Sequence, residues 1–448
     1  MTVQPLVSPW LGMAIVIVAA GVLLGGLRLF QSFRGPSPEL VRKLFHIGGG
    51  LTALTLPWLF ASPWPVILLM AGLLVLLLSM RRVGVLRHSV GQVVHGVDRD
   101  SRGELYFPVA IAAVFVLAQG DAVVYLIPVL VLTFADSLAA LIGVEYGHRR
   151  YTTSEGWKSA EGSIAFFLTT FFCVHTPLLL LTGTERAKTL VIAVILGLLV
   201  MLLEAIAWHG LDNLLIPLIT FALLKSFLNT SLDVLLVDLG ITILMAVFIF
   251  VWRSRTTLND SALMGAVLAG YLCWTLGGPA WVVPPLLLFA TYATFWPRTD
   301  LDRLHVHTFA GVLSVASTAS VWLAVARYLP AADLYYPFTL GFGCHLAMIG
   351  VAGQKFSASG TSRARLVGVN ITRAWLIIFT PFLLLNGLSW LTVVYAVIAI
   401  PAMVACALAF LAIQPGLDQH QEGDARWWRQ GACGLAASAV GLAVNLAT

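Results

Sequence analysis

The sequence has little charge. Asp, Glu, Lys and Arg make up 10% of its 448 residues, against roughly 25% in a soluble globular chain. The net charge of +5 does not indicate nucleic-acid binding, because the basic residues lie in short loops between apolar stretches. No basic segment interleaved with aromatic residues is long enough to bind nucleic acid. A soluble class and a nucleic-acid partner are therefore excluded.

Several familiar chemical signatures are also absent. The five cysteines are far apart and form no Cys-x-x-Cys or Cys/His spacing, which argues against structural zinc or a disulfide framework. No P-loop, nucleophile-elbow or His-Glu-x-x-His pattern occurs. No basic residue precedes the first apolar stretch, and its first positive charge, Arg28, follows it. We expect a retained helix with its N-terminus outside, because a signal peptide has the reverse order.

Apolar residues dominate what is present. Hydrophobic residues make up 59% of the chain, and the mean hydropathy is +0.92. Because a membrane-spanning helix needs about 20 apolar residues, the pattern predicts an all-α, polytopic integral membrane protein with roughly sixteen spans, two of which could be re-entrant. The expected spans are 8–30, 44–61, 64–80, 105–119, 122–146, 160–182, 188–207, 210–229, 234–252, 259–276, 279–297, 306–328, 335–353, 366–385, 388–413 and 428–447.

Basic residues follow every second expected span. Loops rich in Lys and Arg favour the cytoplasmic side, so the sequence predicts that the odd-numbered spans end in the cytoplasm and that both termini lie outside. Arg186 and Lys188 form a small exception on the outer side. The loops at 34–43, 81–104, 147–159 and 208–213 would all be cytoplasmic, facing the compartment that holds nucleotides.

Asp136 lies where a membrane protein least tolerates charge, inside an apolar stretch that begins near Val123. Such acids usually face a polar cavity and mark function, although a buried acid paired for structural reasons is the alternative. Gly143 follows two helical turns later on the same face, and Gly147 comes next. A helix or ligand could approach the backbone closely at Gly143.

The loop after Asp136 ends in Lys158-Ser-Ala-Glu-Gly-Ser163. Ser159 is well placed to cap a helix that starts here, and the N–H groups and dipole of that helix would attract phosphate. Lys158 would add a point charge. We therefore predict a catalytic role for Lys158. The predicted phosphate-binding residues of this region are Gly143, Gly147, Ser159, Glu161, Gly162 and Ser163.

A third motif reads Glu39-Leu-Val-Arg42-Lys43-Leu-Phe-His46. For Arg42 and Lys43 the plain alternative is an anchor that only orients the span. His46 favours function, because it lies a turn inside the span, beside Gly48-Gly49-Gly50, where small residues allow close helix approach. We place Arg42 and Lys43 in the phosphate site and His46 among the catalytic candidates.

The fourth motif pairs Glu204 with Asp212-Asn213. Gly210-Leu-Asp-Asn213 is ordinary turn chemistry, which is the alternative explanation. With Asp136, however, Glu204 and Asp212 could hold a divalent cation, since Mg²⁺ needs only one or two carboxylates besides phosphate oxygens.

Together these motifs resemble the phytol kinase/dolichol kinase family in order and spacing, over about residues 35–250. The resemblance implies an integral membrane enzyme, related to phosphatidate cytidylyltransferases, that phosphorylates a long isoprenoid alcohol with CTP and a divalent metal. It places Asp136, Lys158, Glu161 and Asp212 in the polar site. It places Arg42, Lys43 and His46 in the N-terminal motif.

The remaining chain divides by the same resemblance. Residues 1–34 form an N-terminal transmembrane helix, and 251–448 a second membrane domain that weakly resembles the phytyl-phosphate kinase family through 261–270. His345-Leu-Ala-Met-Ile-Gly350 echoes Leu138-Ala-Ala-Leu-Ile-Gly143, which indicates two related halves. Gly343 stands opposite Asp136, so the second half lacks the acid. A degenerate, structural or lipid-binding role fits it at least as well as kinase activity.

The interpretation favoured by these patterns is a cytoplasm-facing kinase that transfers a phosphoryl group from CTP or ATP, with Mg²⁺, to an isoprenoid alcohol. Asp136 would bind the metal or accept the hydroxyl proton. Cytidylyl transfer to a lipid phosphate would use much the same residues. A transporter is the alternative from another class, but its polar groups should lie near the middle of the bilayer rather than at one face.

Overall fold

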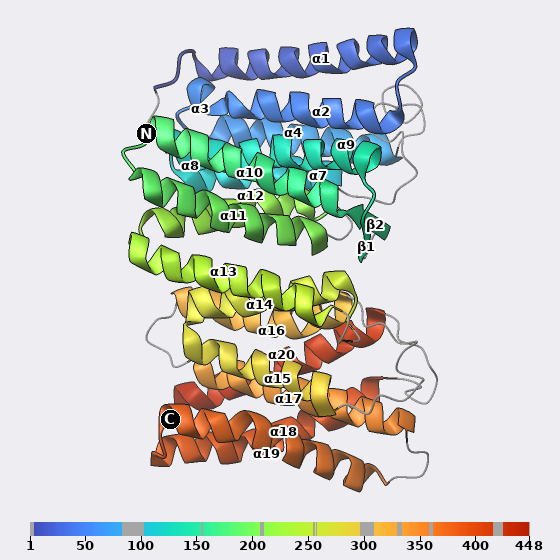
Figure 1. Cartoon of the computed structure of the whole chain (residues 1–448), viewed down its shortest axis with the longest axis vertical. Coiled ribbons are helices and arrows are strands. Elements are labelled where there is room, and N and C mark those ends of the chain that lie inside the picture. The colour runs from blue at the N-terminus through green and yellow to red at the C-terminus, as the bar shows by residue number, and fades with distance from the viewer. Residues whose placement is uncertain are drawn as a thin grey trace. The chain divides into compact units, whose positions relative to one another are not determined.

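The computed structural model describes residues 4–82, 103–153, 156–206, 210–253, 256, 258–295, 309–328, 334–357, 362–414 and 424–447. These residues form helices and one two-stranded antiparallel hairpin (Figure 1). The all-α prediction is thus confirmed apart from the hairpin. The basic stretches 83–102 and 296–308, on which part of the orientation prediction rests, lie outside the described residues.

The chain separates into two compact units, Met1–Val247 and Phe248–Thr448. The elements of the first unit are α1 (Pro9–Arg34), α2 (Pro38–Leu54), α3 (Leu56–Leu59), α4 (Pro63–Arg82), α7 (Gly103–Ala118), α8 (Ala122–Leu130), η1 (Val131–Ala135), α9 (Asp136–Tyr146), β1 (Arg150–Thr153), β2 (Gly156–Ser159), α10 (Ala160–Leu181), α11 (Arg186–Ile206), α12 (Asp212–Leu228) and most of α13 (Leu232–Trp252). Those of the second are α14 (Asp260–Gly277), α15 (Pro279–Phe295), α16 (Phe309–Tyr328), α17 (Tyr335–Ser357), α18 (Arg363–Asn386), α19 (Trp390–Ile413) and α20 (Asp424–Ala447).

Eight of the described helical segments are long and apolar enough to cross a membrane, so the chain is an integral membrane protein. Within the residues that the structure describes, each expected span overlaps helix, but the count of roughly sixteen spans is not confirmed. Helices α2 and α12, for example, are not among the eight. Each has only 17 residues and carries a charged residue in its first turn.

Local sequence explains where the first helices begin and end. Ser8 and Ser37 cap α1 and α2, each followed by a proline in the first turn, where a missing N–H costs nothing. Gly35 ends α1 in the left-handed conformation that glycine adopts without strain. The chain therefore turns sharply, and α1 packs against α2.

The segment from Ala122 to Tyr146 is continuous but not uniform. A π-helical turn, η1, separates α8 from α9 and ends immediately before Asp136. Such a turn widens the helix, leaves carbonyls free of their usual partners and often occurs at functional sites. Helices α2, α10 and α12 all pack against η1, so it lies at the centre of the first unit.

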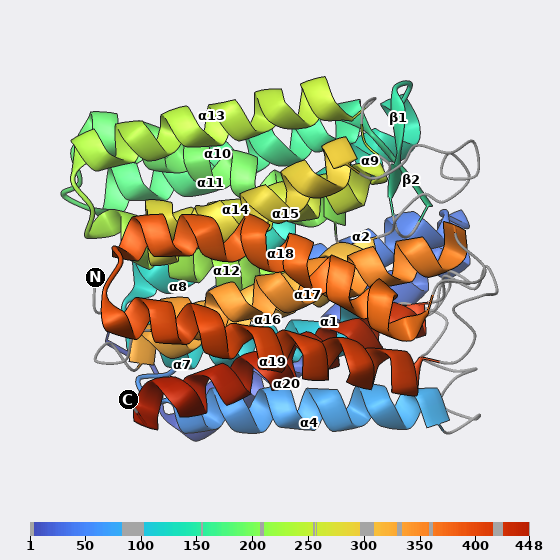
Figure 2. The same ribbon diagram turned by 90° about the horizontal axis from the view of Figure 1, so that it is seen from below.

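The loop expected at 147–159 contains the β1–β2 hairpin, which follows α9 (Figure 2). Tyr151 stands opposite Lys158 in its register. Residues that stand opposite each other in an antiparallel pair project to the same face, so Tyr151 and Lys158 share one face of the hairpin. Successive side chains alternate between the two faces of a strand, so Trp157 projects to the other face, where it is exposed. The hairpin thus fixes the direction of Lys158.

The second unit packs around an apolar core on α17. Its largest fully buried side chains include Tyr336, Phe338, Phe379 and Phe382. Helix α1 lies in the first unit. The division of the chain into 1–34, 35–250 and 251–448, with the functions expected for these ranges, stays a prediction.

Candidate functional site

Asp136 forms an ion pair with Lys43. The ammonium of Lys43 lies 2.7 Å from Oδ2 of Asp136 and 3.3 Å from its main-chain carbonyl oxygen. Only 3% of the Lys43 side chain and 14% of the Asp136 side chain are exposed. Because an isolated buried charge destabilises the fold, each group compensates the charge of the other.

The π-helical turn and a glycine bring α2 close to Asp136. His46 donates from Nε2 to the carbonyl of Leu132, one turn before the acid, at 3.0 Å, and lies 3.9 Å from Asp136 Oδ2. A Cβ on Gly50 would lie 2.0 Å from the Thr133 hydroxyl, so only glycine allows this approach. The small residues noted beside His46 therefore serve helix packing.

Lys158 makes the matching contact on the other side of the site. Its ammonium lies 2.6 Å from Oε1 of Glu204 and also contacts the main-chain carbonyl of that residue. Glu204 is in the last turn of α11, where carbonyls lack helical partners and a cation is favoured. Burial opposes the charge of Lys158, but the Glu204 carboxylate outweighs it and raises the pKa of the ammonium above its usual value.

Arg42 and Glu39 pair with each other rather than with the buried acid. The guanidinium donates twice to the Glu39 carboxylate, at 3.0 and 2.6 Å. Burial favours the neutral form of Glu39, yet the bonds from Arg42 lower the pKa of that carboxyl below its usual range. The pair is part-exposed at the start of α2, and Lys43, not Arg42, reaches the core of the site.

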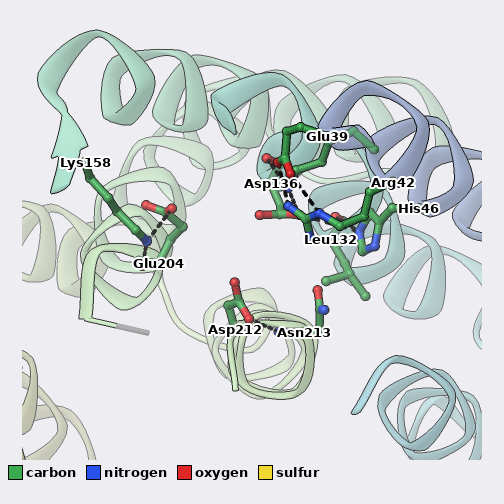
Figure 3. Close-up of polar contacts among 10 residues, drawn as sticks. Glu39, Arg42, His46, Leu132, Asp136, Lys158, Glu204, Asp212 and Asn213 are labelled. Atoms are coloured by element: carbon green, nitrogen blue, oxygen red, sulfur yellow. Dashed lines mark hydrogen bonds and ion pairs between the residues drawn. The ribbon is translucent and has the colours of Figure 1, made fainter. Parts of the chain in front are cut away.

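Asp212 is the carboxylate of this region that has no ion-pair partner among the described residues. It begins α12, and one of its oxygens accepts from the N–H of Asn213 at 3.0 Å. The charges of Asp136, Lys158 and Lys43 all act on it. Figure 3 shows its carboxylate on the side of α12 that faces the other two acids.

The predicted phosphate-binding glycines pack α9 against α10. A Cβ on Gly143 would lie 3.1 Å from the Ser159 hydroxyl, one on Gly162 would lie 3.0 Å from the Ala139 carbonyl, and one on Gly147 would overlap the Gly143 carbonyl at 2.1 Å. The predicted helix cap is confirmed, since Ser159 accepts from the N–H of Gly162 at 3.1 Å. The role of these residues in phosphate binding stays a prediction.

Glu161 and Ser163 hold the hairpin. The carboxylate of Glu161 accepts from the N–H groups of His148 and Arg149 at 3.2–3.3 Å. The hydroxyl of Ser163 lies 2.7 Å from that of Tyr151. Tyr151 and Leu132 were not predicted. The contact of Tyr151 depends on the hairpin register, which was not expected, and a main-chain carbonyl such as that of Leu132 leaves no sequence signal.

The three carboxylates predicted as metal ligands do not gather into one cluster. Within the described ranges, no group of three or more His, Cys, Asp or Glu is placed to hold a metal ion. Asp136 and Asp212 are nevertheless near enough to act on each other electrostatically. One or two carboxylates completed by phosphate oxygens suit Mg²⁺, so the donors fit a cation that arrives with a nucleotide.

Comparison with known proteins gives one relative. The chain is 27% identical over 218 residues to the phytol kinase of Synechocystis sp., an alignment that covers 48% of this chain and 91% of the relative. No family model matches the chain, and no solved structure matches it. Over about half its length, this membrane protein is therefore similar to a phytol kinase.

Proposed function

We propose that the chain is a membrane-embedded kinase that transfers the terminal phosphoryl group of CTP or ATP to the hydroxyl of a long-chain isoprenoid alcohol such as phytol, geranylgeraniol or a polyprenol. The observation that carries the proposal is the pair of acid–lysine contacts, Asp136–Lys43 and Glu204–Lys158, with Asp212 facing both. The similarity to a phytol kinase supports the same chemistry and substrate class.

Phosphoryl transfer needs positioning and charge stabilisation rather than covalent help from the protein. Lys43 and Lys158 would bind phosphate oxygens, and Asp136 and Asp212 would hold a nucleotide-bound Mg²⁺. That cation would supply charge neutralisation at the phosphates. The alcohol oxygen would attack the terminal phosphorus, its proton would pass to a carboxylate, and the nucleoside diphosphate would leave.

The proton acceptor would be one of the acids rather than His46. The Nε2 of His46 already donates to the Leu132 carbonyl, so the proton stays on that nitrogen and Nε2 is not available as a base. A carboxylate within hydrogen-bond reach of the hydroxyl would serve as base. Separate Asp136→Asn and Asp212→Asn variants would show which acid does so.

We place this site at the cytoplasmic face. Its residues come from the first turns of α2, the strand before α10, the last turn of α11 and the start of α12, so most of the site gathers near helix ends. A transporter would instead carry its binding groups midway along its spans. A cysteine at exposed Arg150, tested with a membrane-impermeant maleimide from each side, should react from the cytoplasmic side.

The test is phosphoryl transfer by the purified full chain. The protein would be incubated with Mg²⁺, a panel of isoprenoid alcohols or, separately, a panel of lipid phosphates, and CTP or ATP labelled at the γ-phosphate or at the α-phosphate. Label from the γ-position in a lipid monophosphate, lost in Asp136→Asn, is the expected result. Label from the α-position in lipid, with pyrophosphate released, would instead establish cytidylyl transfer to a lipid phosphate. No transfer from either position by folded protein would contradict the kinase proposal.

A further inference from the structure

The two buried lysines of the site make the same unusual contact. Each ammonium binds both the side-chain carboxylate and the main-chain carbonyl of one acid: Lys43 with Asp136, and Lys158 with Glu204. The two pairs come from different elements, α2 with α9 and β2 with α11. The repeated geometry indicates a common role rather than an accident of packing.

The charges around these pairs are not balanced. Among the described residues, the site holds the carboxylates of Asp136, Glu204 and Asp212 and two ammonium groups, because Arg42 is engaged by Glu39. Asp212 has no ion pair among these residues, although Asp136 repels it. The groups described carry more negative than positive charge, which favours a further cation.

A divalent cation on Asp136 would compete with Lys43. Mg²⁺ binds carboxylate oxygens at about 2.0–2.1 Å, and the ammonium already lies 2.7 Å from Oδ2 of that acid. Two cations on one oxygen repel each other, so the lysine must give way. A lysine ammonium is a compact point charge on a flexible stem, and phosphate oxygens are suitable new partners for it.

We propose that Lys43 and Lys158 are exchangeable counter-ions. Without nucleotide, each neutralises an acid. When a metal–nucleotide binds, each ammonium moves to a phosphate oxygen, and the released carboxylates bind the cation directly or through water. This inference rests on the proposed function for the identity of the phosphate ligand, but it makes a separate claim about binding.

The carbonyl contacts give each ammonium a second partner in this arrangement. Lys158 donates to the main-chain carbonyl of Glu204 near the C-terminal end of α11, where a cation is favoured. Lys158 is 26% exposed, which leaves room for its ammonium to move. Lys43 is more enclosed, with 3% of its side chain exposed, so its exchange would be limited to the space beside Asp136.

Binding measurements on Lys43→Met and Lys158→Met in the full chain test the exchange. Mn²⁺ binding without nucleotide would be followed by loss of the free-ion electron paramagnetic resonance signal. Binding of CTP and ATP, each without divalent metal, would be followed by calorimetry. Each variant should bind Mn²⁺ about fivefold or more tightly, because a competing cation is gone. It should bind nucleotide about tenfold or more weakly, because a phosphate partner is gone.

The decisive feature is that the two affinities change in opposite directions: Mn²⁺ binding becomes tighter and nucleotide binding becomes weaker. A lysine that only locks the fold would, when removed, weaken both ligands or neither. Unchanged or weaker Mn²⁺ binding in a variant that is fully folded at the assay temperature would overturn the proposal. If Lys43→Met does not fold, the binding measurements on Lys158→Met decide the proposal, because Lys158 is part-exposed. Lys225→Met is the matched control, since that lysine is exposed and lies at the far end of α12, and both affinities should stay at wild-type values.

The readout is independent of catalysis. If the exchange is observed but no alcohol accepts phosphate, the proposed function fails and the inference about the two lysines stands. If phosphoryl transfer occurs while Mn²⁺ affinity does not rise in either variant, the kinase proposal stands and the exchange is wrong.

Discussion

The two units of this protein handle buried polar groups differently. In the first unit, two of the enclosed contacts are ion pairs, Lys43 with Asp136 and Lys158 with Glu204. In the second, the fully buried His345 lies 3.0 Å from the Thr318 hydroxyl and 3.4 Å from the Gln430 amide, and all three side chains are neutral or able to be so. Trp322 donates to Ser438 nearby, at 2.9 Å. The buried Arg426 of the second unit lies over the Trp427 ring.

The packing around these groups shows the same contrast. A Cβ on Gly434 would lie 2.7 Å from the His345 ring, so α20 and α17 are in close contact there. At Gly343, the position opposite Asp136 in the internal echo, the nearest neighbours are Met403 and Phe379. Neutral hydrogen bonds between helices stabilise a membrane bundle without the large free-energy cost of burying a charge. Charged side chains inside a membrane are therefore rare and usually functional. The charged pairs of the first unit therefore fit the proposed function, and the His345 contacts fit a stabilising role in the second.

Asp136→Asn should have the largest effect on this contrast. It removes the charge that pairs with Lys43, and phosphoryl transfer should fall by about 100-fold or more. The unpaired lysine should also destabilise the fold by about 3 kcal/mol. Initial rates and thermal unfolding in detergent would be measured together. The control is Glu145→Gln, an exposed acid on the same helix, which should keep wild-type activity.

Lys158→Met should have the next largest effect. A hydrogen bond to a charged group contributes about 1.5–3 kcal/mol, so kcat/KM should fall by roughly 10- to 100-fold. Steady-state kinetics with varied nucleotide would separate the loss between KM and kcat. A variant with wild-type kinetics would remove Lys158 from the site and weaken the contrast between the units.

His345→Leu should affect stability rather than chemistry. It removes the contacts with Thr318 and Gln430, and hydrogen bonds of this kind between membrane helices contribute about 1–2 kcal/mol together. The unfolding temperature should fall while the rate of phosphoryl transfer stays within about threefold of wild type. If instead the rate collapsed with unchanged unfolding, the second unit would also contribute to catalysis.

The smallest expected effect is that of pH on the stabilisation from the Lys158–Glu204 pair. The pKa of Lys158 is raised above its ordinary value of 10.5, so the stabilisation from its pair with Glu204 is fully present below that pH and is lost only as pH rises through the raised pKa. The difference in unfolding temperature between wild type and Lys158→Met should therefore be constant from pH 7 to 9. A difference that shrank steadily across this range would mean that the ammonium loses its proton near neutral pH.

Much of the architecture was predictable because apolar stretches and caps are local signals. The segment 122–146 and the cap at Ser159 appear as expected. The pairing of Lys43 with Asp136 was not predictable, because it joins residues 93 positions apart through a π-helical turn that the sequence does not mark. The hairpin that orients Lys158 was expected as a loop, since Gly, Ser and Thr favour turns and its strands have only four residues each.

The most direct test of the central claim compares the labelled products of three full-length proteins: wild type, Asp136→Asn and His345→Leu. Each would receive an isoprenoid alcohol, Mg²⁺ and γ-labelled nucleotide, and the lipid products would be separated by chromatography. The account predicts a lipid monophosphate from wild type and His345→Leu, and none from Asp136→Asn. Monophosphate from Asp136→Asn at the wild-type rate, or a diphosphate that disappears only in His345→Leu, would contradict it.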